Sequence, residues 1–146
     1  MLVTDGGRYG GYGFYLLKGR PVFTWNYVQL ERVKWQGKQA LTPGKHTLVF
    51  DWKYDGPGMG KSGTGTLSVD GQVLDSHPMN KSLGIVLPWT DTFDVGIDTG
   101  TPVDDKDYAV PFKFTGKINK LTIKVGPNEL APEEKEKISE TFRNKQ

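Results

Sequence analysis

Short apolar runs separated by turn residues dominate residues 1–126, and they restrict this chain to folds built from short strands. The chain of 146 residues carries 19 glycines and 9 prolines, which interrupt long helices. The clearest run covers residues 46–54, where four apolar side chains alternate with other residues, namely Leu48, Phe50, Trp52 and Tyr54. A period of two over this length predicts a strand with one buried face.

Turn signals between such runs predict hairpins. Asp70-Gly71 separates two of them, and this dipeptide favours the type I′ turn, which needs positive φ at both central positions. We predict hairpins over residues 14–27, 66–75 and 111–126, single strands over residues 31–35, 46–54 and 82–87, a glycine-rich opening over residues 6–13 and a long loop over residues 90–107. In the last hairpin, Leu121, Ile123 and Val125 alternate with polar residues.

About ten short strands without an internal helix predict an all-β fold. We expect a two-sheet antiparallel β-sandwich of the jelly-roll, concanavalin A-like type, because two sheets with one apolar face each bury those faces against one another. The sequence contains no internal repeat, which argues against a propeller. The β-sandwich domain is expected over residues 1–126, and a C-terminal helix or tail over residues 127–146.

The pattern changes after residue 127. Residues 131–145 contain no glycine, carry Glu133 and Glu134 at their start and basic residues at their end, an order that the helix dipole favours. Ile138 and Phe142, four residues apart, form one thin apolar stripe. We therefore predict a short α-helix that lies on the sandwich, with a frayed tail as the alternative.

Composition excludes several kinds of chemistry. The sequence has no cysteine, so it has no disulfide, thiolate zinc site or cysteine nucleophile, and its two histidines leave little for histidine chemistry. The charge is nearly balanced, with 19 Lys+Arg against 17 Asp+Glu, which predicts neither a nucleic-acid nor a membrane partner. No apolar run approaches the roughly 20 residues of a membrane helix. Residues 1–5 do not resemble a signal peptide, so the sequence leaves the compartment open.

Two motifs with catalytic associations have structural explanations here. Residues 58–63 satisfy G-x-G-x-x-G, but a phosphate-binding loop needs a helix after its glycines, and residues 64–69 are predicted to be a strand. Ser76 and His77 are neighbours, and adjacent side chains of a strand point to opposite faces. We therefore predict an inter-strand loop at the first motif and no catalytic pair at the second.

Six aspartates crowd the predicted loop over residues 90–107, namely Asp91, Asp94, Asp98, Asp104, Asp105 and Asp107. Calcium takes six to eight oxygen ligands, and such a loop can supply them. The spacing does not match an EF-hand, and a solvated loop with Asx turns explains the same residues. If an ion binds, we expect it to be calcium at Asp94 and Asp98; otherwise no cofactor is expected.

Aromatic residues offer a second candidate site. Tyr9, Tyr12 and Trp89 stand beside glycine or proline in predicted loops, where ring faces could stack on sugars. Trp52 shares a face with Leu48 and belongs to the predicted core instead. The loop aromatics therefore keep a glycan ligand open as a possibility.

Several segments resemble known proteins. Residues 43–48, 54–56 and 67–72 run as a turn, a strand and a Val-Asp-Gly hairpin, an order similar to that of concanavalin A-like and laminin G-like jelly rolls. A closer resemblance rests on residues 6–11, 30–32, 60–66, 94–103 and 111–116. The longest of these reads Asp-Val-Gly-Ile-Asp-Thr-Gly-Thr-Pro-Val. Together they resemble the C-terminal domain of large bacterial arylsulfatases, over about residues 2–126.

This resemblance implies an appended domain without catalytic residues. The family forms its formylglycine nucleophile from C-x-P-x-R or S-x-P-x-R in a separate domain, and here Ser76 and Pro78 are followed by Asn80 where arginine is required. We therefore expect this chain not to be an enzyme by itself, but an accessory domain beside a sulfatase catalytic domain. The alternative is a lectin-like module that binds a glycan, for example a sulfated one. A glycosidase built on Glu31 lacks a second carboxylate in the pattern.

The resemblance also implies a partner. Family members are expected to have an additional strand before the Gly-Gly-Arg segment at residues 6–8, and a sheet that lacks an edge strand leaves backbone groups unpaired. We expect that edge to be covered by a sulfatase catalytic domain, by the C-terminal helix, or by a second copy in a homo-oligomer. If the chain belongs to a longer exported sulfatase, its location is periplasmic or secreted.

Overall fold

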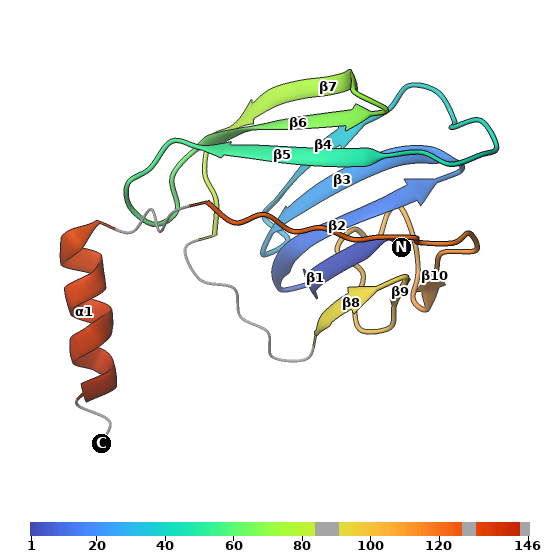
Figure 1. The fold of residues 1–146 in the computed structure, drawn as a ribbon. Coiled ribbons are helices and arrows are strands. Elements are labelled where there is room, and N and C mark those ends of the chain that lie inside the picture. Colours follow the sequence, from blue (N-terminus) through green and yellow to red (C-terminus); the bar gives the residue numbers. More distant parts are fainter. Residues whose placement is uncertain (84–90, 127–130, 144–146) are drawn as a thin grey trace.

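Two antiparallel sheets face each other in the computed structural model, which describes residues 1–83, 91–126 and 131–143 (Figure 1). The larger sheet has the strand order β4-β3-β2-β1-β8, formed by β1 (Val3–Gly7), β2 (Gly10–Leu17), β3 (Arg20–Tyr27), β4 (Glu31–Gln36) and β8 (Phe93–Val95). The smaller sheet has the order β5-β6-β7, formed by β5 (Leu48–Tyr54), β6 (Gly63–Val69) and β7 (Gln72–Met79). A separate pair joins β9 (Ile97–Asp98) to β10 (Phe112–Lys113). The predicted all-β, two-sheet antiparallel sandwich is confirmed.

Aromatic side chains fill the space between the two sheets. Phe23 of β3 stacks on Phe50 of β5 with ring centroids 3.5 Å apart, and Trp35 of β4 is fully buried against both rings. Gly65 of β6 lets the indole approach, because a Cβ at this position would lie 2.5 Å from the Trp35 ring. Trp52 packs against the same cluster, as its alternation predicted. Burial of such large rings is a main source of stability in a domain of this size.

The opposite face of the larger sheet is also covered. Tyr15 and Val22 project there, because they alternate with the core residues Phe14 and Phe23. Residues 99–111 and β10 lie over this face and bury it through Tyr108 and the neighbouring apolar side chains. The molecule therefore has three layers, the smaller sheet, the larger sheet and this covering segment.

The last predicted hairpin, over residues 111–126, is wrong. Only Phe112–Lys113 forms a strand, and it pairs with β9. Residues 117–126 run as an extended trace without strand pairing (Figure 1). Alternation shows which side chains share a face of an extended segment, but a strand also needs a neighbouring chain to pair with.

Other boundaries also differ from the predictions. The glycine-rich opening at residues 6–13 forms the end of β1 and the start of β2, and the long loop at residues 90–107 contains β8 and β9. In the predicted strand over residues 82–87, the first two residues lie outside any strand and the others lie outside the described residues. Segments of two or three strand residues are too short to carry a readable period.

The C-terminal helix α1 (Pro132–Arg143) is confirmed, but it does not lie on the sandwich. It points away from the two sheets (Figure 1). Its first turn is held by Glu134, which accepts hydrogen bonds from the backbone N–H of Ala131 at 2.9 Å and of Met59 at 3.0 Å. The first of these bonds is the reciprocal half of a capping box. The side chains of Ile138 and Phe142 lie outside the described residues.

Among the described residues, no helix has the length and apolar character needed to cross a membrane.

Candidate functional site

A buried network of ionisable groups joins the covering segment to the larger sheet. The ammonium group of Lys34 on β4 lies 2.6 Å from a carboxylate oxygen of Asp104 and 2.7 Å from one of Asp107. The hydroxyl of Tyr15 donates a hydrogen bond of 2.5 Å to Asp107. Burial by itself lowers the pKa of Lys34, but the hydrogen bonds to the two carboxylates outweigh it, and the net pKa is raised. Lys34 therefore stays charged as an ion-pair partner.

A second pair lies beside it. The hydroxyl of Tyr108 donates to a carboxylate oxygen of Asp98 at 2.6 Å and accepts from the backbone N–H of Val103 at 3.0 Å. Asp98 is only 2% exposed, and burial raises the pKa of its carboxyl. Burial likewise raises the pKa of the Tyr108 hydroxyl. This arrangement fixes Tyr108 of the covering segment to β9 through Asp98 and to another part of the same segment through Val103.

Hydrogen bonds also join the turn after β1, strand β3, strand β4 and the covering segment. The buried Asn26 side chain donates to the carbonyl of Gly7 at 2.7 Å and to that of Arg8 at 3.0 Å. Arg8 in turn donates its backbone N–H to the Thr101 hydroxyl at 2.7 Å. Arg32 donates to the carbonyl of Val103 at 3.1 Å. These contacts fix the covering segment against the larger sheet.

The aspartates of the predicted calcium site have other partners. Asp94 accepts a hydrogen bond of 2.9 Å from the hydroxyl of Thr92, and Asp98 is engaged by Tyr108. Within residues 1–83, 91–126 and 131–143, no three acidic or histidine side chains come together in a way that could hold a metal ion. The calcium prediction at Asp94 and Asp98 therefore gains no support from this geometry.

The three nominated aromatic residues do not form a platform in the described part of the chain. Tyr12 faces the core, where its ring stacks on Phe23 at 5.5 Å between centroids. Tyr9, in the turn between β1 and β2, is 54% exposed. Trp89 lies outside the described residues. Of the two nominated residues that the structure describes, Tyr9 has the accessibility that stacking on a sugar requires.

The two motifs with catalytic associations have the geometry that the sequence predicted. The loop over residues 58–63 leads directly into strand β6, without a helix. The Ser76 hydroxyl bonds to that of Thr66 at 2.8 Å. The His77 ring instead stacks on Trp35 at 4.7 Å and bonds to the carbonyl of Lys34 at 2.9 Å. Ser76 and His77 therefore serve separate contacts between neighbouring strands.

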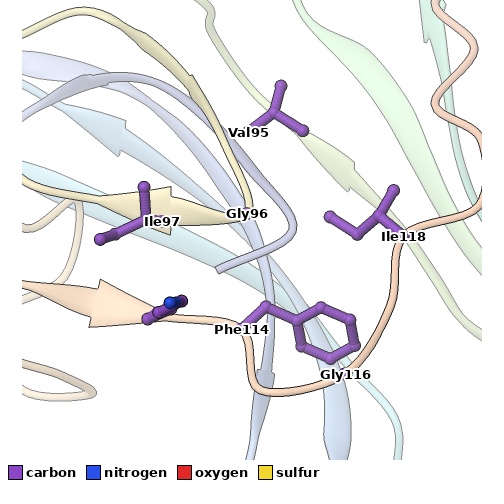
Figure 2. A pocket seen from close by; sticks show the side chains of 7 residues that line it. Val95, Gly96, Ile97, Phe114, Gly116 and Ile118 are labelled. Atoms are coloured by element: carbon purple, nitrogen blue, oxygen red, sulfur yellow. The ribbon is translucent and has the colours of Figure 1, made fainter.

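An apolar surface at the end of the larger sheet was missed by the sequence analysis. Phe93 and Val95 of β8 are 47% and 45% exposed. Beside them lies an open hollow of about 450 Å³, and Figure 2 shows the side chains around it. It is lined by Val95, Gly96, Ile97, Lys113, Phe114, Gly116 and Ile118. We call these residues and Phe93 the β8–β10 surface.

The β8–β10 surface could not be read from spacing, because its residues come from two segments about 20 positions apart that meet only through the pairing of β9 with β10. Contiguous exposed apolar surface of this kind marks sites where proteins bind other molecules. The signal available in the sequence was the apolar character of a segment rich in aspartate, at residues 93, 95 and 97.

No family model matches this chain, and neither the curated proteins nor the solved structures provide a match.

Proposed function

We propose that this chain is a non-catalytic accessory β-sandwich domain that packs beside a sulfatase catalytic domain and helps to shape its substrate cleft. The β8–β10 surface is the observation that carries the proposal. Phe93 and Val95 of this surface are nearly half exposed, and burial of each against a partner is worth on the order of 1 kcal/mol or more. The buried ionisable groups support the same function, because their contacts hold layers of the domain together.

The identity of the partner rests on the resemblance of residues 2–126 to the C-terminal domain of bacterial arylsulfatases. In such an assembly the sandwich is a rigid support, and loops of the catalytic domain would rest on its apolar end. A rigid scaffold of this kind stabilises the residues of the cleft, although the scaffold itself does not contact the substrate.

Association with a catalytic domain tests this function directly. The full chain is mixed with a bacterial arylsulfatase from which the corresponding C-terminal domain has been removed. We expect binding by isothermal titration calorimetry and a gain in sulfate-ester hydrolysis. Val95→Asp should weaken binding at least 10-fold, because it places a carboxylate in an apolar contact.

Val73→Asp is the matched control. Val73 is also a strand valine, 57% exposed, but it belongs to β7 in the other sheet. This variant should bind as the unmodified chain does. Absence of binding, or equal losses for the two variants, would contradict the proposal.

Glycan binding is the weaker candidate. Of the nominated aromatic residues, Tyr9 is the one that the structure shows to be exposed. Binding of the chain to sulfated glycans on an array, with loss on Tyr9→Ala, would favour that function over the accessory role.

A further inference from the structure

The smaller sheet has one closed edge and one open edge. At the β7 edge, the Trp35 indole donates to the carbonyl of His77 at 3.2 Å, and the backbone N–H of Gln36 donates to Asp75 at 3.0 Å. These bonds tie β7 to the neighbouring β4 of the larger sheet. The edge formed by β5 has no comparable cover among the described residues.

The hydrogen bonds of β5 show which of its backbone groups are free. Asp55 donates its N–H to Ser62 at 3.0 Å, and Thr47 accepts from Asp70 at 2.8 Å, so the odd-numbered residues of β5 pair with β6. Backbone groups alternate in direction along a strand, so those of the even-numbered residues point outward. These residues are Leu48, Phe50 and Trp52, whose side chains pack against the core, and Tyr54, which follows them on the same face of the strand. In the described part of the chain, no hydrogen bond reaches their outward N–H and C=O groups.

Residues 119–126 form a second unpaired element. The side chains of Leu121, Ile123 and Val125 are 41%, 58% and 90% exposed, although their spacing is that of a strand with one apolar face. The opposite face carries Lys120 and Lys124. The segment runs in the same direction as β5, from the β10 side of the molecule toward α1 (Figure 1). It would have to reverse its course to pair antiparallel with β5 of its own chain.

We propose that residues 119–126 of a second copy of this chain add antiparallel to β5, and that two copies exchange these segments reciprocally. A neighbouring copy related by a two-fold axis can present the segment in the opposite direction without reversing it. The exchange supplies partners to both unpaired elements at once. It turns the smaller sheet of each copy into four strands, and the apolar side chains of the segment then extend the core.

One register satisfies charge, apolarity and hydrogen bonding together. Pairing Trp52 with Ile123 sets Phe50 opposite Val125 and Tyr54 opposite Leu121, all on the core face. On the solvent face the same register sets Asp51 opposite Lys124 and Asp55 opposite Lys120. The outward backbone groups of the even residues become hydrogen-bonded pairs, and the charged residues take the closer, non-hydrogen-bonded positions.

Neighbouring registers that keep the apolar face inward are less favourable. A shift of two residues in either direction places Lys53 opposite Lys120 or Lys124, and like charges that face each other across strands repel. The charges on the two segments therefore select a single alignment.

Charge reversal tests the proposal on the full chain. Sedimentation velocity should show a dimer for the unmodified chain. Lys124→Asp should raise the dimer dissociation constant about 10-fold or more, because it sets two carboxylates opposite each other, and Asp51→Lys should do the same with two ammonium groups. The double variant Asp51→Lys/Lys124→Asp should restore the dimer. Lys135→Asp, an exposed lysine of α1, is the matched control and should leave the dimer unchanged.

Three outcomes would overturn the proposal. The first is a monomer at every concentration. The second is a dimer that Lys124→Asp does not weaken, which would point to edge-to-edge pairing of two β5 strands. The third is a monomer whose amides at residues 119–126 are protected from hydrogen exchange, which would mean that each chain closes its own edge. The test is separate from that of the accessory function, because Val95→Asp should leave the dimer intact.

Discussion

Asp98 illustrates how burial changes the environment of a residue that the sequence made a conditional candidate for calcium binding. Its carboxylate lies at 2% exposure and accepts from the Tyr108 hydroxyl, and its pKa is raised because burial disfavours the charged form. When the pKa of a carboxyl is higher in the folded chain than in the unfolded chain, ionisation of that carboxyl lowers the stability of the fold. Ionisation of the Asp98 carboxyl is therefore a cost to the stability of the fold.

Asp98→Asn should consequently remove that cost while keeping an oxygen that can accept from Tyr108. We expect the variant to unfold at a temperature equal to or above that of the unmodified chain at pH 7. The difference should disappear as the pH falls below 3.8, the ordinary pKa of aspartate, where the carboxyl is protonated in both states. Thermal unfolding followed by circular dichroism with a chelator present measures this. A clear loss of stability at pH 7 would show instead that the ionised carboxylate stabilises the fold.

The strands show where the local sequence pattern is sufficient to predict strand pairing and where it is not. The Asp70-Gly71 turn was predicted from two residues and is confirmed, with φ of 52° and 81° at its central positions. This prediction succeeds because the hairpin is formed by residues that are neighbours in the sequence, and the turn itself sets the register of β6 against β7. The segment over residues 117–126 has an equally regular pattern but no adjacent strand, so alternation could not tell whether it is paired.

Gly65 is the position of β6 where the backbone lies in direct contact with the aromatic core. A Cβ there would lie 2.5 Å from the Trp35 ring and 2.7 Å from the Phe50 ring. Gly65→Ala should therefore lower the free energy of unfolding by about 1–3 kcal/mol, through overpacking between the sheets. Urea denaturation followed by tryptophan fluorescence measures the loss. Gly126→Ala is the control, because a Cβ at that position meets no atom within 4 Å. A loss at Gly65 no larger than at Gly126 would mean that the sheets separate readily.

The whole molecule contains a layer that the sequence did not predict. Spacing and turn signals were sufficient for two facing sheets and for the C-terminal helix, because these depend on residues near each other in the chain. The covering segment depends on long-range pairs such as Lys34 with Asp104, 70 positions apart. No local pattern distinguishes such an aspartate from a solvated one. The same limit applies to the β8–β10 surface, since exposure is a property of the assembled layers.

Tyr108 makes two hydrogen bonds that fix the conformation of the covering segment, one with Val103 of the same segment and one with Asp98 of β9. Tyr108→Phe keeps the ring, which stacks on Phe112 with centroids 4.5 Å apart, but it leaves the Val103 N–H and the Asp98 carboxylate without this partner. Loss of a buried hydrogen bond costs about 1–3 kcal/mol for each group left unpaired. The covering segment should therefore open more often than the two sheets do.

Hydrogen exchange measured by mass spectrometry distinguishes opening of the covering segment from opening of the two sheets. In Tyr108→Phe, amides over residues 98–112 should exchange at least 10-fold faster, while amides of β6 change less. Tyr9→Phe is the control, because Tyr9 is 54% exposed and should alter neither region. An equal acceleration over both regions would show that the three layers unfold as one cooperative unit. If the separation is observed, the covering segment can loosen while the β5 edge and the core between the sheets stay intact.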